Sequence, residues 1–234
     1  MAFQMIHMEI AYRLLNRIPQ IENPAEFILG SVAPDSVHMN PNYDVSMKVK
    51  SHMFKGCGTW SDTQDYQRWN SNINNVFCEC AMTKKGQAYR DFVIGLCVHC
   101  LTDYWNDLKI WKKLQSENIP PMDFEEFKEA YYPEAKGIDL WLYQNSENTK
   151  TIRKMLTNAV AIEVEGLVNK ADIERQRSYL LNIQYDADTV DISKYRFLSA
   201  SDIDAFIDLA VNEIAEIIIT WVKMSTNSVK QCSN

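Results

Sequence analysis

The sequence contains few of the residues that interrupt helices or form tight β-hairpins. Its 234 residues include seven glycines and seven prolines, and neither Asn-Gly nor Asp-Gly occurs. Apolar and polar residues never alternate over a stretch rich enough in Val, Ile and Thr to predict a half-buried strand. Because strands and hairpins depend on these patterns, their absence argues against a β-protein and predicts an all-α fold.

Three further shortages exclude classes of protein. Six cysteines are too few for a disulfide scaffold of this length. Lys and Arg number 24 against 31 Asp and Glu, and a net charge of −7 argues against a nucleic-acid partner, which needs a basic surface. The start of the chain, MAFQMIHMEIAYRLL, has neither a basic n-region nor a long apolar stretch. We therefore expect no signal peptide, no membrane span and a cytoplasmic protein.

Helical periodicity is present along most of the chain. Apolar residues recur with the period of an α-helix in residues 5–18, 87–111, 152–181 and 203–222. Ser201 and Asp204 are spaced as a capping box at the start of the last segment. No repeat or linker interrupts the pattern, and a hydrophobic content of 46% suffices for one core. Residues 1–234 are therefore predicted to form a single compact multi-helix domain.

One helical segment holds a titratable pair in apolar surroundings. His99 and Asp103 lie four residues apart in 95-GLCVHCLTDYWNDLKIW-111, and such positions share one face of a helix. Burying an imidazole and a carboxylate in an apolar helix is costly unless a third group binds both, and a divalent metal ion can do so. We therefore predict a buried central helix, at about residues 86–108, that carries His-x-x-x-Asp as part of a metal site.

Three residues elsewhere complete a candidate ligand set. His7 shares the inner stripe of the first helix, where a histidine is more often a core residue than a ligand. Asp35 follows Ala-Pro in 29-LGSVAPDSVH-38, where its simplest role is to bond its own backbone in a turn. His52, in 50-KSHMF-54, says little alone. Together, three imidazoles and two carboxylates are the ligand mixture of a catalytic zinc site.

The order of these residues resembles that of the bacterial zinc-dependent phospholipase C family, whose all-α fold is related to the single-strand-specific fungal nucleases. The resemblance covers roughly the first half of the chain and rests on His7, 27-FILGSVAPDSVH-38, 51-SHMF-54 and 94-IGLCVHCLTDYWN-106. It implies one zinc ion held by four residues, which are Asp35, His52, His99 and Asp103. It also implies a second ion between His7 and the bridging Asp103.

The activity implied by the resemblance is hydrolysis of a phosphodiester by metal-activated water, with a small phosphoester or a phospholipid headgroup as the substrate. Asp35 is then the catalytic residue, which binds the ion or takes the proton of the attacking water. The sequence departs from the three-metal members of the family because no histidine follows His99, so Glu163 and Glu165 lack a histidine partner. We therefore expect one zinc ion, or two, rather than three.

Other interpretations remain open from the sequence. In the first, the chain is a non-catalytic protein of the same fold, whose metal ion pins the first helix to the central one and whose surface binds a ligand or partner. In the second, four thiolates form a structural zinc site, although their simpler role is in the core: Cys78, Cys80, Cys97 and Cys100. Four aromatic residues are expected in the core but would also suit a pocket for a headgroup or base: Trp60, Tyr104, Trp105 and Trp111.

Overall fold

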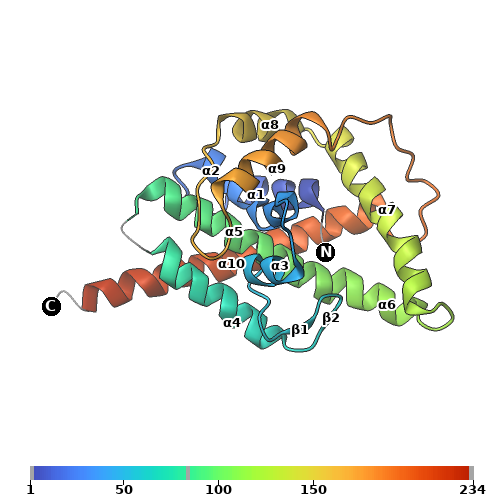
Figure 1. The fold of residues 1–234 in the computed structure, drawn as a ribbon, viewed down its shortest axis with the longest axis horizontal. Helices are drawn as coiled ribbons and strands as arrows, with labels where there is room; N and C mark the ends of the chain where they lie inside the picture. Colours follow the sequence, from blue (N-terminus) through green and yellow to red (C-terminus); the bar gives the residue numbers. More distant parts are fainter. Residues whose placement is uncertain (1–2, 83–84, 232–234) are drawn as a thin grey trace.

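Helices make up most of the chain in the computed structural model, which describes residues 3–82 and 85–231 (Figure 1). The α-helices are α1 (Gln4–Leu14), α2 (Pro24–Gly30), α3 (Val45–Ser51), α4 (Tyr66–Val76), α5 (Gln87–Asn106), α6 (Lys112–Asn118), α7 (Phe124–Asn145), α8 (Thr149–Asn158), α9 (Lys170–Asn182) and α10 (Ala200–Gln231). Three shorter helical turns are the 3₁₀ segment η1 (Ala33–Met39) and the π-helical segments η2 (Phe77–Ala81) and η3 (Asp107–Trp111). Within the described residues, the strands are β1 (Gly58–Thr59) and β2 (Asp62–Thr63), which form one antiparallel hairpin. The all-α prediction is confirmed.

Helix α5 passes through the middle of the molecule (Figure 1). Fifteen of its 20 residues are buried, and it packs against α1, α2, α4 and α10. A helix that is covered on every side needs apolar residues on every face, which explains why its sequence is apolar throughout rather than striped. The predicted buried central helix is therefore confirmed, and His99 and Asp103 on it are held away from bulk water.

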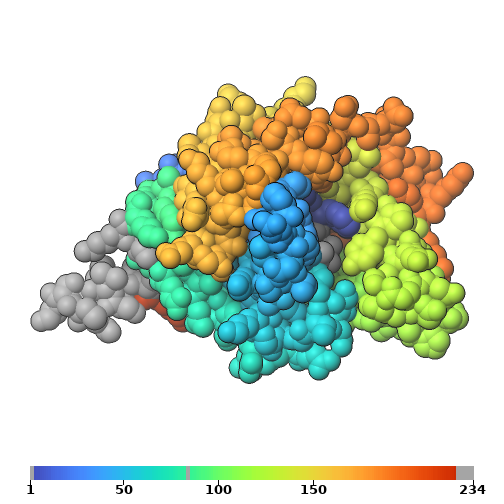
Figure 2. All heavy atoms as spheres, in the orientation of Figure 1, coloured from blue at the N-terminus to red at the C-terminus, as the bar shows by residue number. Residues whose placement is uncertain are grey.

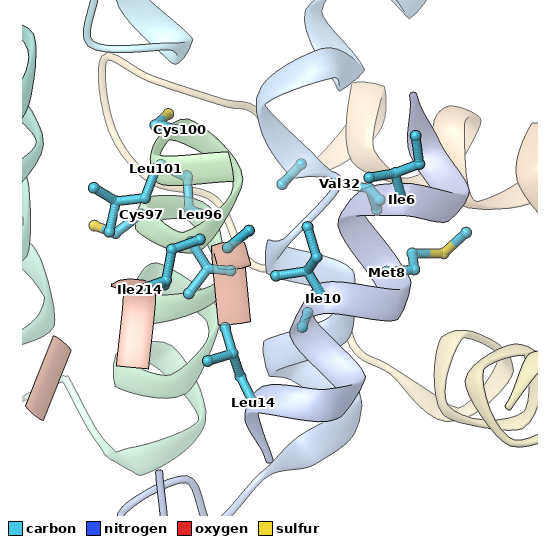
Figure 3. Close-up of a cluster of buried hydrophobic side chains, with 14 of the residues drawn as sticks. Ile6, Met8, Ile10, Leu14, Val32, Leu96, Cys97, Cys100, Leu101 and Ile214 are labelled. Carbon is cyan, nitrogen blue, oxygen red and sulfur yellow. The ribbon is translucent and has the colours of Figure 1, made fainter. Parts of the chain in front are cut away.

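The core fixes α1 against α5. Figure 3 shows Ile10 and Leu14 on the side of α1 that faces α5, in one cluster with Ile214 from α10. All three side chains are fully buried, and burial of each contributes about 1.5–3 kcal/mol relative to exposure. Because His7 lies one turn before Ile10, this packing also determines how His7 approaches α5.

A pair of glycines lets α2 and α5 touch through their backbones. A Cβ atom at Gly30 would lie 2.1 Å from the carbonyl oxygen of Phe92, and one at Gly95 would lie 2.1 Å from that of Phe27. No side chain fits at either position, so the crossing requires glycine on both helices. The close approach brings the carbonyl of Ser31, at the end of α2, within reach of side chains on α5.

The prediction of one helix over residues 152–181 is wrong. Helix α8 ends at Asn158 and α9 begins at Lys170. Between them Val164 pairs with Val168 in an isolated β-bridge, and Gly166, in the turn of this bridge, has φ of +76°, a left-handed conformation that favours glycine. Ala159, Ala161, Val164 and Val168 of this loop are buried in the core, so an apolar pattern continues across the loop although the backbone is not helical.

The capping box of α10 lies two residues earlier than predicted. The backbone N–H of Ser199 donates to the carboxylate of Asp202, and the N–H of Asp202 donates to the Ser199 hydroxyl. Ser199 and Asp202 have the same spacing as Ser201 and Asp204, and the helix begins at Ala200. The sequence contains both candidate boxes, and the tertiary position of the helix start selects the first.

The longest helix in the described residues, α10, carries acidic side chains along its exposed face. Within the parts of the chain that the structure describes, no helix combines the length and apolar content required to cross a bilayer.

Candidate metal centre

His99 is held from behind by a backbone carbonyl. Its ring is fully buried on α5, and its Nδ1 lies 2.8 Å from the carbonyl oxygen of Ser31 at the glycine crossing. Since a carbonyl can only accept a hydrogen bond, Nδ1 must carry the hydrogen and donate it. In the neutral ring Nε2 then presents a lone pair on the opposite side, which is the form in which histidine binds metals.

His52 is held in the same way at the end of α3. Its fully buried ring places Nδ1 3.1 Å from the carbonyl oxygen of Lys48 and 2.9 Å from the hydroxyl of Ser51. That hydroxyl donates to the same carbonyl, so both partners accept from Nδ1–H, and Nε2 again presents a lone pair. The indole N–H of Trp69 donates to the His52 carbonyl over 2.9 Å, which fixes the backbone of this residue.

The two Nε2 atoms converge on one point together with two carboxylates. They lie 3.3 Å apart, and Oδ1 of Asp35 lies 3.2 Å from Nε2 of His52. Oδ2 of Asp103 lies 3.7 Å from Nε2 of both histidines. Ligand atoms around a tetrahedral zinc ion, each about 2.0–2.2 Å from it, are separated by about 3.4 Å. These four separations are close to that value, but among the described residues no group that could hold one ion contains both Asp35 and Asp103.

His7 approaches the same centre from α1. Its fully buried ring stacks on that of His99, with 3.8 Å between the ring centres and 9° between the planes. Its Nε2 lies 3.5 Å from Oδ1 of Asp103, whereas its Nδ1 has no hydrogen-bond partner among the described residues. Asp103 thus faces His7 with one oxygen and His52 and His99 with the other.

Two overlapping groups of residues could hold an ion, one made of Asp35, His52 and His99 and the other of His7, His99 and Asp103. Nε2 of His99 can bind one ion at a time, because its Nδ1 is engaged with Ser31. A carboxylate can place one oxygen on each of two ions, so Asp103 is the residue suited to bridge them. The two groups share His99, whereas the two-ion expectation has Asp103 as the shared residue, so the bridging role of Asp103 stays a prediction.

Asp35 does not make the local turn contact that is the simplest expectation for this residue. It lies in η1, directly after Pro34, with a side chain that is 14% exposed. Its Oδ1 faces His52, and its Oδ2 accepts a 2.6 Å hydrogen bond from the side-chain amide of Gln4. Gln4 thus holds Asp35 in place, although nothing in the sequence singles it out, since its partner is 31 residues away.

The charges at the centre favour a cation. Burial, and after it the electrostatic effect of the adjacent His7, lower the pKa of His99 to about 3, so this ring is neutral near pH 7. Burial alone would raise the pKa of Asp35 and Asp103, but contacts with the surrounding histidines lower both below the usual value. Two ionised carboxylates and at least one neutral imidazole therefore surround the site, which is a donor set suited to a divalent ion such as zinc.

Two pockets reach residues of the centre. The first, here called the aromatic pocket, has space of about 20 Å³ for the centres of water molecules, and its lining includes Phe54, Trp60, Trp69, Trp111, Tyr132 and Asp103. The second has about 220 Å³ of such space, and its lining includes Gln4, Asp35 and His38. Figure 2 shows a hollow in this face of the molecule, between α3 (blue) and α7 (yellow-green), with the start of α1 (dark blue) inside it.

The aromatic residues singled out in the sequence divide into two sets. Trp60 and Trp111 line the aromatic pocket, although Trp111 is also buried as expected for a core residue. Tyr104 and Trp105 pack partly buried against the core and do not line it. Trp69 also lines the aromatic pocket but was not singled out in the sequence, because it lies on α4, which carries no metal-ligand motif.

The cysteines and the later glutamates lie outside the candidate centre. Neither of the two ion-holding groups found in the described residues contains a cysteine. Cys97 and Cys100 are buried and suit the core role, whereas Cys78 is exposed. Glu163 and Glu165 lie in the loop between α8 and α9, and Glu163 lines a different pocket with Asn40 and Asp172.

Comparisons with protein-family models, with curated proteins and with solved structures found no match to this chain. The resemblance to zinc-dependent phospholipase C therefore stays a prediction, and the geometry of the centre carries the functional argument.

Proposed function

We propose that the chain is a metal-dependent hydrolase of phosphoric esters that uses zinc and acts on a phosphodiester, in the manner of phospholipase C. The proposal depends on one observation: the Nε2 atoms of His52 and His99 lie close together and near two carboxylates. Both rings are oriented by hydrogen bonds from Nδ1 to backbone carbonyls. Such a set of acceptors is stable in a buried position when a cation lies between them. A zinc ion bound there would lower the pKa of its water toward roughly 7 and neutralise charge on a phosphoryl oxygen.

Each residue has a defined part in this proposal. His52 and His99 are neutral donors whose orientation the carbonyls of Lys48 and Ser31 fix. Asp103 is the bridging carboxylate. Oδ1 of Asp35 faces the centre, while Oδ2 accepts a hydrogen bond from Gln4. Asp35 is therefore suited to bind the ion or to accept the proton of the attacking water.

The test begins with metal content and continues with turnover. Protein purified without chelator is assayed for zinc by elemental analysis and for hydrolysis of bis-nitrophenyl phosphate. We expect about one to two zinc ions per chain, a rate that rises through the pKa of bound water, loss of activity on chelation and recovery on adding zinc. Protein that contains no metal and binds none on titration would contradict the proposal.

A second candidate function is supported by the size of the aromatic pocket. Its space of about 20 Å³ next to Asp103 holds about one water molecule, which suits a closed structural site as well as a catalytic one. In that case zinc would pin α1 and η1 to α5 and the protein would act by binding. Full zinc occupancy, higher thermal stability with zinc and no turnover of diesters, monoesters or phospholipids would select this candidate.

A further inference from the structure

Gln176 is a buried amide on the inner face of α9. Its residue exposure is 3%, and it lies between Ile173 and Leu180 on the buried stripe of the helix. Its Nε2 lies 3.2 Å from Oε1 of Gln4, whereas its own Oε1 has no hydrogen-bond partner among the described residues. A buried polar atom without a partner costs folding free energy, so an apolar side chain would suit this position better if only stability mattered.

The orientation of both glutamine amides follows from the carboxylate of Asp35. An ionised carboxylate can only accept hydrogen bonds, so the atom of Gln4 that lies 2.6 Å from Oδ2 of Asp35 must be its nitrogen. The oxygen of Gln4 then faces α9 and can only accept, so the nitrogen of Gln176 must face it. These three side chains form a directed chain of hydrogen bonds, here called the amide relay: Gln176, Gln4 and Asp35.

Contacts beside the amide relay fix α9 against η1, the segment that carries Asp35. The side-chain amide of Asn40, directly after η1, donates to the carboxylate of Asp172 on α9 over 2.7 Å. The guanidinium of Arg175 donates to the carbonyl of the last residue of η1 over 3.1 Å. Because Gln176 follows directly on the same helix, these contacts hold its amide at a defined distance from the segment that carries Asp35.

Asp35 needs a restraint of this kind because other partners compete for it. Its side chain is 14% exposed, and Nε2 of His38 lies 3.8 Å from its Oδ1. Rotation toward water or toward His38 would turn Oδ1 away from His52, which it faces at 3.2 Å. The hydrogen bond from Gln4 to Oδ2 opposes this rotation. Gln176 in turn keeps Gln4 from presenting its oxygen to the carboxylate, where two acceptors would repel each other.

We propose that Gln176 is a positioning residue of the metal centre, which fixes the Gln4 amide so that Asp35 presents Oδ1 to the ion. This inference rests on the proposed metal centre and deepens it by naming a residue on α9 that controls how tightly zinc is held. Loss of a group that hydrogen-bonds to a metal ligand typically lowers metal affinity by about 10- to 100-fold. Gln176 acts one hydrogen bond further away, so its effect should be smaller than that of Gln4.

The test measures zinc affinity, by competition with a chromophoric chelator, in wild type, Gln176→Met, Gln4→Ala and the double variant. Methionine has nearly the length of glutamine but cannot donate a hydrogen bond. We expect Gln176→Met to weaken zinc binding by about three- to tenfold and Gln4→Ala by about tenfold or more. The double variant should lose no more affinity than Gln4→Ala alone, because Gln176 acts only through Gln4.

Gln184→Met is the matched control. Gln184 lines the same pocket as Gln4, Asp35 and Gln176, but its amide makes no hydrogen bond to the amide relay among the described residues. The control should therefore bind zinc as wild type does. Weaker zinc binding in Gln184→Met, equal to that in Gln176→Met, would overturn the proposal, because any lost amide in the pocket would then have the same effect.

Thermal unfolding of the zinc-free proteins separates positioning from a structural role. Since Gln176→Met removes a buried oxygen that lacks a described partner, its Tm should lie within about 3 °C of the wild-type Tm or above it. Unchanged zinc affinity in Gln176→Met, or losses that add in the double variant, would overturn the proposal. A larger fall in Tm together with weaker zinc binding would also overturn it, because Gln176 would then act through the stability of the fold.

These outcomes separate the two proposals. Zinc binding that depends on Gln176 through Gln4, without ester hydrolysis, would support the positioning role and contradict the hydrolase. Zinc-dependent hydrolysis with unchanged zinc affinity in Gln176→Met would support the hydrolase and contradict the positioning role. Absence of zinc binding would contradict both.

Discussion

Two aspartates on the central helix, Asp91 and Asp103, are both buried, yet their surroundings are opposite in kind. Oδ2 of Asp91 accepts hydrogen bonds from the backbone N–H groups of Glu22 and Asn23, at 3.0 and 2.7 Å, where α2 begins. The oxygens of Asp103 instead face imidazole nitrogens. One of these, Nε2 of His99, presents a lone pair rather than a hydrogen. A buried carboxylate among N–H donors is satisfied by the protein alone, whereas one that faces a nitrogen lone pair is suited to a cation.

The largest effect should come from exchanging each of these two carboxylates for an amide. Asp103→Asn should lower zinc content and reduce the rate of diester hydrolysis by about 10³-fold or more, since the metal supplies several kcal/mol of transition-state stabilisation. Asp91→Asn should keep both zinc and rate, because its partners lie at the start of α2. Elemental analysis and steady-state kinetics check the pair. Equal zinc loss in the two variants would remove the distinction.

Asp35→Asn should have the next largest effect. The amide keeps the shape of the side chain but lacks the negative charge that binds the ion or takes a proton, so the rate should fall by about 10²-fold or more. Gln4→Ala is the matched variant. It removes the 2.6 Å hydrogen bond to Oδ2 of Asp35 but leaves the Asp35 carboxylate in place. A rate within about threefold of wild type is what the loss of one weak contact would cause. Such a rate for Asp35→Asn would show that Asp35 is not a catalytic residue.

Asp139 extends the comparison to a third buried carboxylate. It accepts hydrogen bonds from the N–H groups of Met5 and Ile6 and from the Tyr185 hydroxyl, yet burial raises its pKa to about 6. A folded pKa above the unfolded value of about 3.9 means that the folded state holds the proton more tightly. The contribution of Asp139 to the free energy of unfolding is complete below the pKa of the unfolded state. It is lost as the pH rises through the pKa of the folded state.

The free energy of unfolding should therefore fall by up to about 3 kcal/mol between about pH 4 and pH 6 from Asp139 alone. Asp139→Asn should remove this part of the pH dependence, because the amide oxygen still accepts both backbone N–H bonds. Denaturant titrations of the two proteins at a series of pH values provide the measurement. Identical slopes for wild type and variant would mean that the carboxyl titrates near its ordinary pKa.

The smallest effect is expected from His7→Ala. This change tests whether His7, which faces Oδ1 of Asp103, is a metal ligand. If His7 binds a second ion, the change should lower the number of zinc ions per chain by one. If His7 is a core residue, zinc content should be unchanged, and the emptied position should lower the free energy of unfolding by about 1–3 kcal/mol. Elemental analysis together with denaturant unfolding separates the two outcomes.

The sequence predicted those parts of the centre that depend on local spacing. Helical periodicity located α1 and α5, and the interval of four residues placed His99 and Asp103 on one face. The resemblance then selected His7, Asp35 and His52, and the structure brings all five side chains together. Their binding of a metal stays a prediction that the experiments above test.

Residues that act through distant partners were not predictable. Gln4 reaches Asp35, and Ser31 reaches His99 through a backbone carbonyl, so neither has a residue type that marks its role. Gln176 resembles an ordinary polar residue of a helix until the fold places it against Gln4. The helical pattern was wrong across residues 159–169 because several apolar residues of this loop, such as Val164 and Val168, are buried without being helical.

The glycine crossing of α2 and α5 has a consequence for substitutions outside the candidate centre. Any side chain at Gly30 or Gly95 would push the two backbones apart, and the Ser31 carbonyl would move away from the His99 ring that it orients. The imidazole would then be free to turn its other nitrogen toward the centre. Two positions that contribute no candidate ligand atom therefore determine which nitrogen of His99 faces the centre. Replacing either glycine should therefore disturb the packing of α2 on α5 and the candidate centre together.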